Sequence, residues 1–89
     1  MVLLVRNKVN DFDQWKRVFD SQAEAARAAG LNLIQMWRSV DEAGEVFFLF
    51  EVEDRRRALA FMNAPEAASS GVEAGVIEGD YHFLAVYCR

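Results

Sequence analysis

His82 is the residue of this chain best suited to proton transfer near neutral pH. It is the single histidine among 89 residues, and imidazole is the side chain whose ordinary pKa lies between pH 5 and 8. It follows Tyr81 in an expected strand, so it could exchange a proton with a phenolic substrate. The alternative is a histidine on the sheet surface or at a dimer interface. We take His82 as the candidate catalytic residue.

A second set of residues could form a site for a small apolar or aromatic ligand. Aromatic rings make walls for planar molecules, and neighbouring amide or guanidinium groups orient them. The candidates lie on expected strands and are Asn7, Trp37, Arg38, Phe48 and Tyr87. For each of them the alternative is ordinary packing, because aromatic residues in a sheet usually form core.

The remaining reactive or charged groups favour structural roles. Cys88 lies six positions after His82 with no third ligand nearby, so no metal is expected, and a lone cysteine allows at most a cross-link between two copies. The run 55–57 is Arg-Arg-Arg and could attract an anionic substrate. Its acidic neighbours Glu53 and Asp54 favour a solvated, ion-paired surface instead.

The first elements are a strand and a long helix. Residues 2–5 are an unbroken aliphatic run, which is typical of a strand buried on both faces. Asn10, Asp11 and Asp13 can cap a helix, and apolar residues then recur at helical spacing from Trp15 until Gly30, which predicts one helix of about 17 residues.

A hairpin follows, and its second strand is apolar on both faces. Residues 33–40 and 46–52 are separated by a turn at 41–44. Alternation places Phe48 and Phe50 on one face of the second strand, and Phe47 and Leu49 on the other. Both faces of that strand must therefore be shielded from water.

The last part of the chain predicts a second helix and a final strand. Asp54 can cap a helix whose apolar stripe runs over 58–62 until Pro65 interrupts it, and 66–74 continues as a short irregular or helical segment. Gly75 and Gly79 are expected to flank a turn before a strand over 81–88.

This order predicts one α+β domain over residues 1–89, a ferredoxin-like βαββαβ sandwich. Its four-stranded antiparallel sheet carries two helices on one face. The other face carries large apolar residues with nothing left in the chain to cover it. We therefore expect a homodimer that pairs through the sheet, with Phe47 and Phe48 on opposite faces of it.

Composition excludes several classes of partner. The net charge is −4, so nucleic acid and anionic membrane surfaces are not expected partners. The longest apolar run, 46–50, is far shorter than a membrane span, and the N-terminus does not resemble a signal peptide. We expect a cytoplasmic protein.

The chain resembles the dimeric α/β-barrel superfamily, which includes antibiotic biosynthesis monooxygenases, small polyketide cyclases and haem-degrading enzymes. The residues that carry the resemblance are Asp11-Phe12-Asp13 leading to Trp15 and Phe19, Glu51-Val52-Glu53-Asp54, then Ala58, Phe61, Pro65 and Ala74-Gly75-Val76. The resemblance implies a barrel of two four-stranded sheets, with a pocket between the helices and the sheet of each subunit.

The resemblance implies a cofactor-independent monooxygenase or cyclase acting on an aromatic or polyketide-like molecule. The alternative is a non-enzymatic dimer that binds a small molecule or serves in a stress response, which better explains why the sequence has no evident catalytic constellation. In the haem-degrading branch an Asn ends the first strand, which Asn7 matches. The Trp and His of that branch would fall near Phe61 and within 71–74, where this chain has no axial nitrogen, so no haem or other cofactor is expected.

Overall fold

The computed structural model describes residues 1–87 as a βαββαβ arrangement in which each helical segment is divided in two. This confirms the predicted order of elements. The strands are β1 (Val2–Val9), β2 (Leu31–Arg38), β3 (Glu45–Val52) and β4 (Val76–Leu84), and the helices are α1 (Phe12–Ser21), α2 (Ala23–Ala28), α3 (Arg55–Met62) and α4 (Pro65–Glu73). No described helix is long and apolar enough to cross a membrane.

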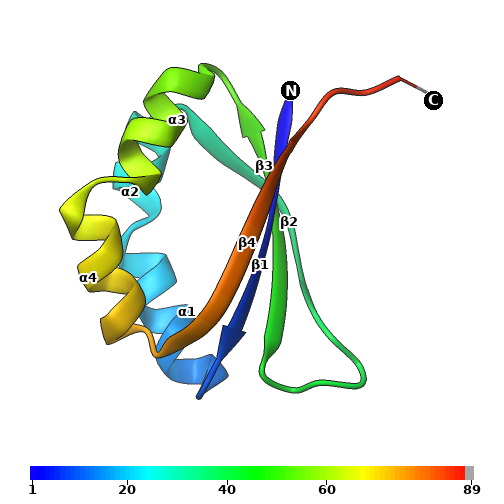
Figure 1. The fold of residues 1–89 in the computed structure, drawn as a ribbon, viewed down its shortest axis with the longest axis vertical. Coiled ribbons are helices and arrows are strands. Elements are labelled where there is room, and N and C mark those ends of the chain that lie inside the picture. Colours follow the sequence, from blue (N-terminus) through cyan, green and yellow to red (C-terminus); the bar gives the residue numbers. More distant parts are fainter. Residues whose placement is uncertain (88–89) are drawn as a thin grey trace.

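The four strands form one antiparallel sheet in the order β2-β3-β1-β4. All four helices lie on one face of it, and the other face is bare (Figure 1). The register aligns Val5 with Phe48 on β3 and with Tyr81 on β4. Because side chains alternate along a strand, these three residues point toward the helices, while their sequence neighbours point away.

Aspartate caps start α1 and α3, as the sequence predicts. The Asp11 carboxylate accepts hydrogen bonds from the backbone N–H groups of Asp13 and Gln14, and Asp54 does the same for Arg56 and Arg57. Each cap satisfies donors that the first helical turn leaves unpaired. Both helices therefore begin where the sequence places them.

The expectation of one continuous helix of about 17 residues before Gly30 was wrong, because the helix breaks at Gln22. The Gln22 backbone N–H bonds to the Phe19 carbonyl at 3.1 Å, and the Ser21 hydroxyl donates to the Val18 carbonyl at 2.6 Å. A serine that bonds back to its own helix competes with the backbone ladder and bends the helix. The break separates α1 from α2 within the same layer.

The last strand also differs from the expectation. Gly75 makes the turn alone, with φ at +75°, and Gly79 lies inside β4 opposite Asn7. A Cβ at position 79 would come within 2.7 Å of the Asn7 side chain, so glycine is required by close approach rather than by a turn. The strand ends at Leu84 instead of reaching Cys88, which lies outside the described residues.

The arginine run at the start of α3 makes contacts other than the expected ion pairs. The Arg55 guanidinium lies 4.8 Å from the centre of the Phe83 ring, and Arg57 donates to the Ala28 carbonyl at the end of α2. A guanidinium can both stack on an aromatic ring and donate to a carbonyl. The two contacts therefore link α3 to β4 and to α2.

Candidate functional site

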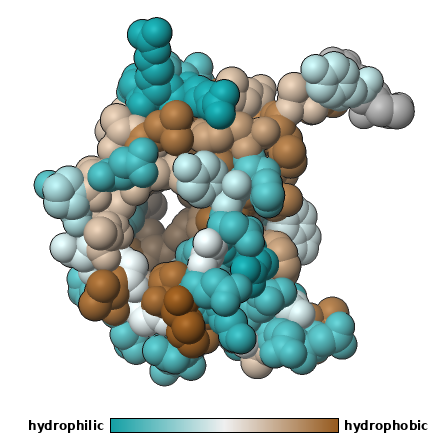
Figure 2. Space-filling view, viewed as in Figure 1, coloured by the Kyte–Doolittle hydropathy of each residue, from teal (hydrophilic) through white to brown (hydrophobic). Residues whose placement is uncertain are grey.

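A cavity of about 680 Å³ lies between the helices and the sheet. Figure 2 shows the hollow from the side, between the helical layer and the strands. The cavity takes lining residues from all four strands and all four helices. This volume is within the range of small-molecule sites, which are concave and mostly apolar.

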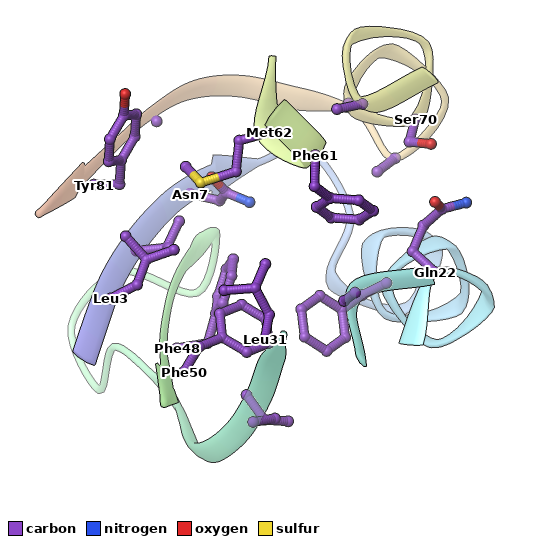
Figure 3. Close-up of a pocket in the computed structure, with 18 of the residues that line it drawn as sticks. Leu3, Asn7, Gln22, Leu31, Phe48, Phe50, Phe61, Met62, Ser70 and Tyr81 are labelled. Atoms are coloured by element: carbon purple, nitrogen blue, oxygen red, sulfur yellow. The ribbon is translucent and has the colours of Figure 1, made fainter. Parts of the chain in front are cut away.

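Aromatic side chains from the sheet and the helices line the cavity. Phe48 and Phe50 rise from β3, with ring centres 5.6 Å apart, and Trp15 and Phe19 of α1 stack on each other at 4.9 Å. Phe61 projects from α3 toward the sheet (Figure 3). Rings in edge and stacked contacts are rigid, so they favour a flat apolar occupant.

Asn7 places an amide in this apolar wall, and its orientation is fixed by Trp15. Its oxygen accepts a hydrogen bond from the Trp15 indole N–H at 3.2 Å, and its nitrogen donates to the Arg6 carbonyl at 3.1 Å. The indole nitrogen can only donate, which settles which end faces it. Trp15 is 2% exposed, so this bond also satisfies a buried donor.

The sequence-derived ligand residues divide between the cavity and other places. Asn7 and Phe48 line the cavity, but Trp37, Arg38 and Tyr87 do not. Trp37 pairs with Phe47 on the bare face of the sheet. The Arg38 guanidinium lies 4.1 Å from the centre of the Phe12 ring, and Tyr87 follows the end of β4 with its surface 96% exposed.

His82 lies on the face of the sheet that is turned away from the cavity. It pairs with Leu4 of β1, and its Nε2 is 3.9 Å from the Asp80 carboxylate. Because side chains alternate along β4, its neighbour Tyr81 faces the cavity instead. A proton carrier inside the cavity would therefore have to be a residue other than His82.

Several lining residues were not singled out from the sequence as site residues. They come from the apolar stripes of α1 and α3 and from the inward side of β4, and they include Trp15, Phe19, Phe61, Met62 and Tyr81. The alternation along β4 was the signal that could have identified Tyr81, because it puts this residue on the same face of the sheet as Val5, its partner in the register. Helical stripes look the same over a filled core and over a hollow one, so the sequence could not separate these two cases.

The bare face of the sheet carries a charge cluster around Arg6. The guanidinium contacts Glu78 at 2.7 Å, Asp80 at 3.0 Å and Glu45 at 3.4 Å. The hydrogen bond from Arg6 lowers the pKa of Glu78, and nearby Lys8 lowers it further. The hydrogen bonds to Glu78 and Asp80 raise the pKa of Arg6, which stays charged. Carboxylates from β3 and β4 thus meet one cation of β1.

We expect Arg6→Gln to raise the pKa of Glu78 toward its ordinary value. Because the pKa of Glu78 is lower in the folded chain than in the unfolded one, the pair stabilises the fold above the unfolded pKa. That contribution is lost as the pH falls through the folded value. An NMR titration of the Glu78 carboxyl carbon measures the change, with Arg56→Gln as a control. An unchanged Glu78 titration in Arg6→Gln would rule out this pairing.

Comparison with known proteins identifies the fold. No protein-family model and no curated protein matches the sequence. Solved structures do match, and several of them are described as candidate antibiotic biosynthesis monooxygenases. The Caulobacter crescentus protein has 18% identity and a TM-score of 0.74, and the alignment covers 97% of this chain and 89% of that one.

Two further structures of this description match over a similar share of the chain. The Bacteroides thetaiotaomicron protein has 12% identity and a TM-score of 0.72, covering 99% of this chain and 90% of that one. The Deinococcus radiodurans protein has 11% identity and a TM-score of 0.70, covering 100% and 96%. At such identities the likeness is one of fold, as the resemblance in the sequence implied. The chain has the ferredoxin-like fold of the antibiotic biosynthesis monooxygenase-like proteins.

Proposed function

We propose that this protein binds a flat apolar molecule of aromatic or polyketide type in the cavity between its helices and its sheet. The observation that carries the proposal is the cavity of about 680 Å³ walled by Trp15, Phe19, Phe48 and Phe61. An apolar hollow of this size is unusual in an 89-residue chain, since small domains have little core to spare.

The chemistry we propose is oxygenation or cyclisation of the bound molecule without a bound cofactor. The cavity would hold the reacting atoms in place, with the Asn7 amide and the Tyr81 hydroxyl as polar anchors. Support comes from the fold, which is also that of proteins described as candidate antibiotic biosynthesis monooxygenases. Turnover of a bound aromatic molecule in the presence of oxygen would separate this chemistry from binding alone.

The second candidate is a non-enzymatic protein that binds or sequesters the same class of molecule. The position of His82 favours it, because this histidine lies on the bare face of the sheet and not in the cavity. Under this hypothesis the bound molecule is recovered unchanged. Mass spectrometry of the ligand after incubation distinguishes the two functions.

We also propose that the protein works as a homodimer that pairs through the bare face of the sheet. Apolar side chains gather there beside the Arg6 cluster, and the register identifies them as Val2, Leu4, Trp37, Phe47, Leu49 and Leu84. Trp37 is 46% exposed and Leu84 42% exposed. The same face of a second copy offers a matching apolar surface, so the two sheets can pack face to face and bury these side chains.

The cavity is tested by filling it from α4. Ser70 lines the cavity, whereas its neighbour Ser69 is exposed and does not line it. We expect Ser70→Phe to weaken binding of N-phenyl-1-naphthylamine, a neutral aromatic probe that fluoresces in apolar sites, by at least about tenfold. Ser69→Phe is the matched control and should bind normally. Equal binding by both variants, with unchanged thermal unfolding, would refute the cavity as the site.

A further inference from the structure

The cavity runs across the full width of the sheet. Its lining includes residues of both edge strands, with Asn32 and Leu33 on β2 and Asp80 and Tyr81 on β4. Gln22 and Tyr81 lie at opposite ends of the hollow (Figure 3). The molecule measures 18 Å along its shortest axis. A ligand that fills this space is therefore elongated, with two ends that meet different surroundings.

The two ends differ in charge. At the β4 end, Tyr81 faces the cavity, and the charge cluster around Arg6 lies on the other face of the sheet. At the β2 end, the lining includes Asp20, which is bound by Lys16, and Arg27 of α2. Within residues 1–87 the Arg27 side chain has no hydrogen bond or ion pair. The β2 end thus offers a guanidinium whose five donors are free for a ligand.

We infer that the ligand carries an acidic group at one end of an elongated apolar body, and that Arg27 binds this group at the β2 end of the cavity. The inference rests on the proposed function, because it assigns one end of the same cavity. A guanidinium matches a carboxylate with two parallel hydrogen bonds. The aromatic walls then hold the apolar body, and among the described lining residues the β4 end offers an acidic group no cation.

Two probes of the same shape test the inference. 2-Anthracenecarboxylate is a rod with its acid at one end, and 2-anthracenemethanol replaces that acid with a neutral alcohol. We expect Arg27→Gln to weaken the binding of the carboxylate by about five- to tenfold. The affinity for the alcohol should change by less than about twofold. Arg56→Gln removes an equal charge from α3, whose residue 56 does not line the cavity, and should change neither.

A shape isomer and salt supply further readouts. 9-Anthracenecarboxylate has its acid in the middle of the long edge, so it should bind more weakly than the 2-isomer. The preference of the wild type for the carboxylate over the alcohol should shrink in high salt, because the mouth of the cavity is exposed to screening ions.

The outcomes separate this inference from the function on which it rests. If both probes bind and Ser70→Phe blocks them, but Arg27→Gln weakens neither or both equally, the cavity stands and the role of Arg27 is refuted. If neither probe binds and Ser70→Phe has no effect on N-phenyl-1-naphthylamine, the cavity itself is not the site. Selective loss of the carboxylate in Arg27→Gln supports the inference.

Discussion

Phe48→Asp unfolds the protein under native conditions. Phe48 is 6% exposed, and its ring lies 5.6 Å from that of Trp15 and 5.1 Å from that of Phe19. The substitution removes these contacts and places a carboxylate without a partner between sheet and helices. We expect a loss of about 5 kcal/mol or more, which is comparable with the whole stability of a small domain. Circular dichroism and chemical denaturation measure the effect.

Phe48→Leu is the control for this result. It keeps an apolar side chain of smaller volume, so the protein should remain folded with a smaller loss of stability. A folded Phe48→Asp variant with normal denaturation would contradict the assignment of Phe48 to the layer between the sheet and the helices.

Phe47→Asp has a different expected result, which is a folded monomer. Phe47 is half-buried on the bare face of the sheet and pairs with Trp37 and Arg6. In a symmetric pair of sheets each substitution occurs twice, so two carboxylates enter the proposed interface. Native mass spectrometry should show the wild type as a dimer and Phe47→Asp as a monomer at the same concentration.

Val72→Asp is the matched control for the dimer. Val72 is 82% exposed on α4, on the other side of the molecule from the bare sheet face (Figure 1). The same chemical change there should leave the dimer intact. A monomeric wild type, or a Phe47→Asp protein that remains dimeric, would overturn the proposal of pairing through the sheet.

Much of the fold follows from short sequence patterns. Asp11 and Asp54 marked the starts of two helices, because a capping carboxylate acts on donors two and three residues away. The alternation in β3 placed Phe48 and Phe50 on one face and Phe47 on the other, since the period of a strand is two residues, and the structure shows that the first face meets the helices. These signals are local, so one sequence was enough to detect them.

The remaining features depend on contacts between distant parts of the chain. Gly79 was interpreted as part of a turn, and only the closeness of Asn7 explains a glycine within β4. Phe61 and Tyr81 have the pattern of core residues, yet they face a hollow. Whether a layer is filled depends on how far the helices stand from the sheet, which no spacing in the sequence encodes.

Energy transfer from Trp15 tests most directly whether the cavity holds an aromatic molecule. Trp15 and Trp37 are the two tryptophans of the chain, and Trp15 lines the cavity while Trp37 lies behind the sheet. In Trp37→Phe, all tryptophan emission therefore reports on the cavity. We predict that N-phenyl-1-naphthylamine quenches this emission saturably, with one probe per chain, and that Ser70→Phe abolishes the quenching. Probe binding that leaves the Trp15 emission unchanged would contradict the account.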